Sequence, residues 1–271
     1  MLSEKTELLS KGLYKDIPDV ITLKSLPTSS ELEFVGSEDF DKTMLDDIFP
    51  QAIEEKFDYY SLLELDYQWI CRCLRILNYG PYYTTNNIFC SKCNQISSGE
   101  YQADLRTVGA VPLPKDFKND ITISEDEFIN FEGSIKIKLL TMRETLTAYS
   151  DEAFKMKDGK INRELARICY MITQFGTKTG LTPIETKTIV LRDLSSADYI
   201  VLKDRVTSLT DYGLRAGGTI HCPKCGSPEA SYIALVDDRF FRPTVGNLQS
   251  WRDDKRRGAA ENTAGDKTKT V

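Results

Sequence analysis

The chain has 271 residues, of which 41% are hydrophobic and 28% are charged, and its formal net charge at pH 7 is −6. These values are ordinary for a soluble globular protein with one large domain or two modest ones. No stretch approaches the roughly 18 apolar residues that a membrane span requires, and the first residues contain no apolar signal segment. We therefore expect a folded protein that is not inserted in a membrane.

The negative charge is concentrated near the N-terminus. Residues 1–60 contain 14 acidic and 6 basic residues, a net charge of −8, so residues 61–271 together carry +2. Contacts with phosphate need a basic protein surface, so this distribution argues against a nucleic acid as the main partner. It is compatible with basic protein partners.

Residues 1–38 are predicted to form an acidic N-terminal arm rather than a packed element. Pro18, Pro27 and a run of small polar residues interrupt its short apolar patches. Two alternatives stay open: a loosely ordered, solvated tail, or a segment that becomes ordered along a neighbouring subunit. From Asp39 to about Ile53 the apolar spacing indicates a short helix that Pro50 breaks.

The strongest helix signal lies at residues 61–78. On a helical wheel the polar residues form one stripe and the rest is apolar except for Asp66, so most of the helix is predicted to be buried. A carboxylate on that apolar face is costly unless paired, so we expect Asp66 to be a structural anchor that bonds an arginine or free backbone N–H groups. Asn78-Tyr79-Gly80-Pro81 ends the helix. The polar stripe consists of Ser61, Glu64, Gln68, Cys71, Arg72, Arg75 and Asn78.

A β-hairpin that carries Cys90-Ser-Lys-Cys93 is expected next, and it returns through residues 100–105. Together with the preceding helix it makes up a predicted unit at residues 39–110. Residues 111–212 are predicted to be an inserted domain that begins with the linker Val111–Pro114. Its strands are expected at 121–123 and 134–139, and its helices at 141–157, 162–174, 184–192 and 196–209.

A second hairpin closes the fold at residues 213–246. It carries Cys222-Pro-Lys-Cys225 and returns through residues 231–236. The following pair Phe240-Phe241 is expected either to pack in the core or to form an interface. Residues 247–271 are rich in Gly, Ala, Lys and Asp and are predicted to be a disordered tail.

The two Cys-x-x-Cys pairs predict a metal site. Each turn directs two sulfur atoms toward one point, and two such turns give the four thiolates of a closed tetrahedral Zn²⁺ site. Because no coordination position stays open, the zinc is expected to be structural, with Cys90, Cys93, Cys222 and Cys225 as its ligands. The alternatives are two disulfides or unrelated thiols. A redox Cys-x-x-Cys normally opens a helix after a strand, and neither pair does so.

The remaining cysteines, Cys71, Cys73 and Cys169, are expected to pack as small apolar side chains in a reducing cytosol. The 128 residues between Cys93 and Cys222 exceed the usual spacing in a zinc ribbon. Closure entropy nevertheless grows by only about 0.6 kcal/mol per doubling of loop length, whereas structural zinc can contribute roughly 10 kcal/mol. We therefore predict an α+β fold: a zinc-ribbon-like pair of β-hairpins joined by the four-cysteine site, with a mainly helical insertion and flexible termini.

Several of these residues together resemble a known family. The pattern Asp66-x-x-Trp69-Ile70-x-x-x-Leu74-Arg75-x-x-x-Tyr79-Gly80-Pro81, followed by Cys90-x-x-Cys93, is similar to the baseplate hub subunit family of T-even-like, contractile-tailed bacteriophages. Tyr212-Gly213, Cys222-Pro-x-Cys225-Gly226 and Phe240-Phe241-Arg242-Pro243 resemble the longer members of that family. The resemblance covers residues 40–245, to within a few positions, and leaves out the N-terminal arm and the C-terminal tail.

The resemblance implies a structural or assembly component of a phage tail baseplate, without enzymatic activity, whose partners are other tail and baseplate proteins. It places the chain in the host cytoplasm during assembly, or in the virion, and does not decide between these. Without the resemblance, the residues indicate a zinc-stabilised protein-interaction module.

The main alternative is a zinc-ribbon adaptor that binds nucleic acid. Lys92, Lys224 and the run Lys255-Arg256-Arg257 favour it, whereas the acidic pI of about 5.1 and the neighbouring Asp253 and Asp254 count against it. An enzyme is disfavoured because the chain contains no phosphate-binding loop or nucleophile elbow. His221, the only histidine, could replace a ligand but is expected to flank the metal, and Asp151-Glu152 are expected to face water.

Overall fold

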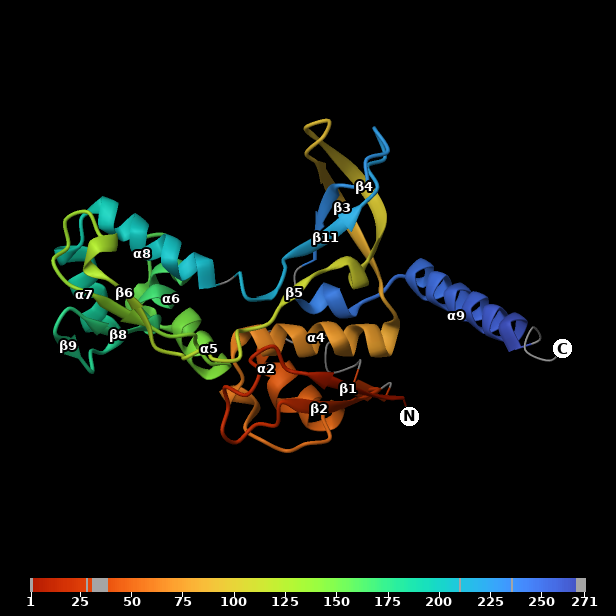
Figure 1. Ribbon diagram of the computed structural model, residues 1–271, viewed down its shortest axis with the longest axis horizontal. Coiled ribbons are helices and arrows are strands. Elements are labelled where there is room, and N and C mark those ends of the chain that lie inside the picture. The colour runs from red at the N-terminus through yellow and green to blue at the C-terminus, as the bar shows by residue number, and fades with distance from the viewer. Residues whose placement is uncertain (1, 28, 31–38, 210, 235, 267–271) are drawn as a thin grey trace.

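The computed structural model describes residues 2–27, 29–30, 39–209, 211–234 and 236–266. The fold belongs to the α+β class, and its described residues form helices of different lengths and four small antiparallel sheets. Figure 1 shows a long central helix, α4, with a hairpin on one side, a projecting sheet on the other and a helical unit at one end. No helix in the described part of the chain has the length and apolar character of a membrane span.

The central helix α4 spans Glu64–Tyr79, close to the predicted range of 61–78. A 3₁₀ turn at Tyr59–Ser61 precedes it. Its C-terminal end is set by Gly80, whose φ of +76° suits glycine and whose N–H donates to the carbonyl of Ile76 at 2.9 Å. The helix therefore ends at the Gly80-Pro81 pair, as the sequence predicts.

The N-terminal segment differs from the predicted arm over residues 1–38. Its described residues contain an antiparallel hairpin of β1, Ser3–Glu7, and β2, Val20–Lys24. In β2 the residues alternate in exposure, and Ile21 and Leu23 are buried. This is the pattern of a strand with one face on the core, and the hairpin lies against α4 (Figure 1). Residues 28 and 31–38 lie outside the described part.

A nearly continuous helical run occupies the position where a short helix was predicted at residues 39–53. It consists of α2 at Phe40–Thr43, a π-helical segment at Met44–Ile48 and α3 at Phe49–Ala52. Pro50 does not break this run, which differs from the prediction. Since the π-helical turn ends just before it, Pro50 stands in the first turn of α3, where a missing N–H is tolerated.

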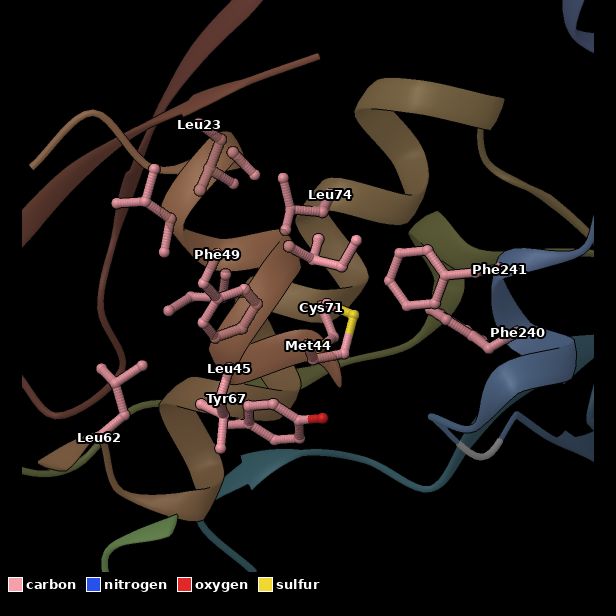
Figure 2. Close-up of a cluster of buried hydrophobic side chains, with 14 of the residues drawn as sticks. Leu23, Met44, Leu45, Phe49, Leu62, Tyr67, Cys71, Leu74, Phe240 and Phe241 are labelled. Atoms are coloured by element: carbon pink, nitrogen blue, oxygen red, sulfur yellow. The ribbon is translucent and has the colours of Figure 1, made fainter. Parts of the chain in front are cut away.

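The main core lies between the hairpin, the α2–α3 run and α4. Figure 2 shows Leu23, Phe49 and Leu74 packed in one cluster. Phe240 and Phe241, from the far end of the chain, enter the same cluster with exposed fractions of 1% and 3%. Of the two alternatives for this pair, the structure therefore supports core packing.

The cysteine hairpins form one four-stranded sheet, which we call the knuckle sheet. Its order is β11-β12-β3-β4, and all neighbours are antiparallel. The strands are β3 at Tyr82–Cys90, β4 at Gln95–Asp104, β11 at Gly217–Ile220 and β12 at Ala230–Ile233. At its base a 3₁₀ turn, Leu105–Thr107, leads to β5 at Ala110–Val111, which pairs with β10 at Gly213–Leu214.

The inserted residues form a unit with its own core and a sheet of order β6-β7-β8-β9. Its strands are β6 at Ile121–Ile123, β7 at Ile135–Ile137, β8 at Ile172–Phe175 and β9 at Lys178–Thr179. Its helices are α5 at Met142–Ser150, α6 at Arg163–Met171, α7 at Pro183–Asp193 and α8 at Ser196–Leu209. Short 3₁₀ turns lie at Glu125–Glu127 and Glu152–Phe154. The insertion is therefore less helical than predicted.

Two of the predicted helices in this unit are too long. The helix predicted at 141–157 ends at Ser150, because the Asp151 carboxylate accepts from the N–H of Ala153 and caps a separate 3₁₀ turn. The helix predicted at 162–174 ends at Met171, and the chain continues as β8, which pairs with β7. A partner strand that is distant in sequence thus decides the conformation of residues 172–175.

The C-terminal residues also differ from the prediction of a disordered tail from residue 247. A 3₁₀ turn at Asp238–Phe241 is followed by α9, which spans Val245–Asp266 and points away from the body (Figure 1). Thr244 and Asn247 bond each other's backbone N–H groups at 3.0 and 3.3 Å, which fixes the start of the helix. Residues 267–271 lie outside the described part.

Candidate metal centre

The four cysteines of the two Cys-x-x-Cys pairs meet at the tip of the knuckle sheet. The sulfur atoms of Cys90, Cys93, Cys222 and Cys225 all lie within 4.8 Å of one another. The Cys90–Cys225 distance is 3.6 Å and the Cys93–Cys222 distance is 3.9 Å. Two segments that are far apart in the sequence therefore supply one cluster.

Strand pairing explains how the cluster forms. β12 pairs with β3 so that Ala230 lies opposite Cys90, and β11 pairs with β12 so that Ile220 lies opposite Ala230. The turn after β3 and the turn after β11 therefore project from the same end of the sheet. Ile88 and Ala230 are buried between them and form a small apolar base beneath the sulfur atoms.

The two cysteine turns share one backbone feature. The residue after the second cysteine of each pair has a left-handed conformation: Asn94 with φ +50° and Gly226 with φ +72°. Asparagine and glycine are the residues that adopt this conformation most readily. In the second turn the N–H of Gly226 donates to the carbonyl of Cys222 at 2.9 Å, which closes the loop around the sulfur atoms.

Two of the six distances between the sulfur atoms match a tetrahedral metal ion, and the other four are at most 4.8 Å. Zn–S bonds of about 2.3 Å give a separation of about 3.8 Å between two thiolates of a tetrahedron. The 3.6 and 3.9 Å distances lie on either side of this value. They are too long for a disulfide, whose S–S bond is about 2.05 Å, and all four cysteines are free thiols in the structure.

Backbone amides favour the thiolate form of one of the four cysteines, Cys222. Hydrogen bonds from the N–H groups of Cys225 and Lys224 to the sulfur lower the pKa of Cys222 to about 6. The pKa of Cys93 is raised to about 12, because burial and the surrounding sulfur atoms disfavour a second negative charge. A cation bound between the four sulfur atoms would offset the repulsion between neighbouring thiolates. The thiolate is also the form of cysteine that binds metal.

Polar residues around the cluster join the two turns rather than add ligands. Lys224 donates from Nζ to Oε1 of Gln95 at 2.7 Å, which links the second turn to β4. The exposed His221 has its Nδ1 3.5 Å from the carbonyl oxygen of Gly226. Within the described residues the cluster consists of the four cysteines without His221, as expected for a flanking residue.

The other three cysteines lie away from the cluster. Cys71 and Cys169 are buried in the two main cores, and Cys73 is half-buried with its sulfur 3.6 Å from the hydroxyl of Thr6. Burial raises the pKa of each thiol. They pack as apolar side chains, as the sequence predicts.

Asp66 is the anchor that the sequence predicts, and it is fully buried. Its carboxylate accepts from the backbone N–H groups of Leu9 and Ser10 at 2.6 and 3.1 Å. It also accepts from the hydroxyl of Tyr14 at 2.6 Å. Of the two predicted partners, backbone N–H groups are therefore present, and they belong to the N-terminal segment. Burial raises the pKa of Asp66.

Arg75 is the residue that the sequence interpretation missed. It was assigned to the polar stripe of α4, yet its side chain is fully buried. It donates to the carbonyl oxygens of Phe240, Gly80 and Tyr82, each at 2.7 Å. The signal for this role was the Gly80-Pro81 helix end, because the last carbonyls of a helix need donors from elsewhere.

Fold and site together define an α+β protein in which a four-cysteine cluster could hold a metal ion such as zinc. No protein-family model, no characterised protein and no solved structure matches this chain. The family resemblance of residues 40–245 is therefore a hypothesis that rests on the sequence pattern.

Proposed function

We propose that Cys90, Cys93, Cys222 and Cys225 bind one structural Zn²⁺ and that the chain is a structural or assembly component of a contractile phage tail baseplate. The observation that carries the metal assignment is the mutual approach of four thiols from two matched turns within 4.8 Å. All four positions of a tetrahedral ion are filled by sulfur, so the metal serves stability and leaves no site for a substrate.

The zinc would join the two cysteine hairpins, which are separated in the sequence by the insertion. β3 and β4 follow α4, whereas β11 and β12 come after the whole insertion. A shared ion fixes both hairpins at the same end of one sheet, and its binding free energy becomes folding free energy. Both ends of the insertion would then be fixed by the metal-linked hairpins. Such an arrangement is suited to a rigid structural subunit.

The baseplate role rests on the resemblance, and the positions that carry it have structural contacts here. Asp66 bonds the N-terminal segment, and Trp69 donates from Nε1 to the carbonyl of Glu7 at 3.0 Å. Arg75 joins the end of α4 to the segment at Phe240. Asp66, Trp69 and Arg75 thus connect α4 to distant parts of the chain and stabilise the fold. This role of the matching residues supports a structural subunit that acts through protein–protein contacts. The proposal assigns the chain no catalytic step.

The metal is tested by analysis of protein purified without chelator, which should contain close to one zinc per chain. Cys225→Ser should lower both the zinc content and the free energy of unfolding. Cys73→Ser is the matched control, since Cys73 lies outside the cluster. Full zinc content and unchanged stability in Cys225→Ser would rule out the four-thiolate site.

The baseplate role is tested by affinity purification of the tagged chain from infected cells. Other tail and baseplate proteins should be recovered, and fractionation of mature particles shows whether the chain stays in the virion or leaves after assembly. Recovery of RNA polymerase or nucleic acid in place of tail proteins would contradict the proposal.

The nucleic-acid adaptor is the second candidate, and the exposed basic residues Arg252, Lys255, Arg256 and Arg257 of α9 favour it. Asp254 lies among them and pairs with Arg257 at 2.7 Å and with Arg106 at 3.5 Å, which reduces their net charge. A gel shift with DNA or RNA that weakens steeply with salt would support the adaptor.

A further inference from the structure

The four cysteines of the cluster differ in their exposure to solvent. Cys225 is exposed and Cys93 is half-buried, whereas Cys90 and Cys222 are buried, with exposed fractions of 1% and 2%. Figure 1 shows the knuckle sheet projecting away from the rest of the molecule. Because oxidation of cysteine follows exposure and thiolate character, Cys225 is the member of the cluster that a dissolved oxidant meets first.

The proposed zinc site makes this exposed sulfur atom reactive. A cysteine that coordinates a metal is a thiolate, and the thiolate is the form that peroxides oxidise. Its attack on hydrogen peroxide gives a sulfenic acid, which a second thiolate within reach converts to a disulfide. The cluster places the sulfur atoms of its other three cysteines within 4.8 Å of Cys225.

Cys90 is well placed to be that second thiolate. Its sulfur atom lies 3.6 Å from that of Cys225, a shorter distance than the 3.9 Å between Cys93 and Cys222. A disulfide bond of about 2.05 Å requires the sulfur atoms of Cys90 and Cys225 to move by only about 0.8 Å each.

Cys222, in the same turn as Cys225, is a poorer partner. Its sulfur atom accepts hydrogen bonds from the backbone N–H groups of Cys225 and Lys224. A disulfide at Cys222 would remove the negative charge that strengthens these hydrogen bonds. A disulfide between Cys90 and Cys225 leaves that thiolate and its donors in place.

We propose that Cys225 and Cys90 form a disulfide on oxidation, which replaces the metal as the link between the two cysteine hairpins. This redox step rests on the proposed zinc site and regulates it. The Cys225 thiolate forms a bond to one peroxide oxygen, the O–O bond breaks and hydroxide leaves. The Cys90 thiolate then forms the S–S bond and displaces a second hydroxide. The two sulfur atoms lose two electrons, and these reduce one hydrogen peroxide to two hydroxide ions.

The disulfide would release the zinc and keep the hairpins joined. Only Cys93 and Cys222 remain as thiolates, whereas a structural zinc site has four protein ligands. Cys90 and Cys225 are 135 positions apart in the sequence, so their bond closes the chain around the whole insertion. A chain that is made in a reducing cytosol and carried in a virion passes into an oxidising medium. There the disulfide would hold the knuckle sheet together without metal.

The test uses the purified, zinc-containing, full-length chain, treated with hydrogen peroxide at neutral pH. Remaining thiols are blocked with N-ethylmaleimide, and the disulfides are mapped by mass spectrometry of tryptic peptides without reduction. Lys92 and Lys224 lie between the cysteines of the two pairs, so trypsin places each of the four cysteines in a separate peptide. Released zinc is measured with a colorimetric indicator, and dimedone added in a parallel sample labels sulfenic acid.

The expected result is a linked peptide pair that contains Cys90 and Cys225, at a yield at least about tenfold above any other disulfide. One zinc should be released per disulfide, and dimedone should label Cys225. Cys73→Ser is the matched control and should give the same map, since Cys73 lies outside the cluster. Cys90→Ser should increase the dimedone label on Cys225. Because that variant also loses a metal ligand, the wild-type map decides the outcome.

A disulfide within one turn, any other pairing, or oxidation of Cys225 without a disulfide would overturn the proposal. These outcomes in zinc-containing protein contradict the redox step alone and leave the metal site standing. Absence of zinc from the untreated protein would instead contradict the metal site on which the redox step rests.

Discussion

The indole ring of Trp251 in α9 lies directly on the Cα atom of Gly80 at the end of α4. A Cβ atom at position 80 would come within 2.3 Å of the Trp251 ring, far inside van der Waals contact. Gly80 therefore has two roles: it ends α4 with a φ of +76°, and it leaves room for the helix that comes last in the chain. This contact acts together with hydrogen bonds between α9 and the knuckle sheet, such as that from Gln102 to Ser250 at 2.9 Å.

Gly80→Ala is expected to lower the free energy of unfolding by about 2–4 kcal/mol, because it combines backbone strain with overpacking against Trp251. The measurement is urea unfolding followed by circular dichroism. Gly159→Ala is the control, since Gly159 has a φ of +84° but nothing within 4 Å of its would-be Cβ. That control should cost about 1 kcal/mol, from backbone strain alone.

A double-mutant cycle separates the contact with Trp251 from the strain. In a Trp251→Ala background, Gly80→Ala should cost at least about 1 kcal/mol less than in the wild type, since contacting residues couple by this amount. Equal costs in both backgrounds would show that α9 does not rest on Gly80.

Arg75→Lys is expected to destabilise the protein by about 2–4 kcal/mol, since a lysine cannot reach the three carbonyl oxygens that the guanidinium satisfies in a buried site. Burial lowers the pKa of Arg75 to about 10, so the group is still charged at neutral pH. Arg72→Lys is the control: Arg72 is half-buried and bonds a single carbonyl, that of Leu105. A similar midpoint of chemical denaturation for both variants would contradict this account.

The features that the sequence predicted well are those set by neighbouring residues. The cysteine turns depend on two-residue spacing and on a following Asn94 or Gly226 that accepts a left-handed backbone. Helix α4 depends on its own apolar periodicity and its Gly80-Pro81 end. Asp66 was recognised because a lone carboxylate on an apolar face requires donors.

The features that the sequence did not reveal depend on distant partners. β1 consists entirely of polar residues and is a strand because it pairs with β2. Residues 172–175 follow a helix without a break and become β8 because β7 lies beside them. Arg75 is polar by type, and its burial follows from carbonyl groups supplied by positions 80, 82 and 240. The strand partners β2 and β7 and the Phe240 carbonyl cannot be read from a local window, because each lies far along the chain from the residues that it contacts.

The stability of the inserted unit is expected to fall in acid through Asp198. Its carboxylate accepts from the N–H groups of Ile129 and Asn130 at 2.6 and 3.0 Å and from the hydroxyl of Ser195 at 2.6 Å. Burial alone would raise the pKa of Asp198, but the hydroxyl and amide donors together outweigh it and lower the pKa to about 2, below its usual value of 3.8. For a depressed carboxyl pKa, the stabilisation is present above the unfolded pKa and is lost as pH falls through the folded pKa.

Asp198→Asn tests this prediction. The wild type should have the higher midpoint of chemical denaturation at pH 6, and the gap between the two proteins should close between pH 4 and pH 2. Amide hydrogen exchange in α8 reports directly on the stability of the inserted unit. A gap that stays constant over this range would show that the carboxylate of Asp198 has no role in folding.

Removal of the metal is expected to loosen the knuckle sheet while the inserted unit stays folded, because the two have separate cores. The binding free energy of structural zinc adds to folding, so its loss should accelerate amide exchange in β3, β4, β11 and β12 by at least about 100-fold, which corresponds to about 2.7 kcal/mol. Exchange in β7, α6 and α8 should change little. Hydrogen exchange with mass spectrometry, before and after chelation, measures both. Added Zn²⁺ should restore protection in the wild type but not in Cys225→Ser. An equal increase in exchange rate in both units after chelation would mean that the cysteine cluster does not stabilise the knuckle sheet locally.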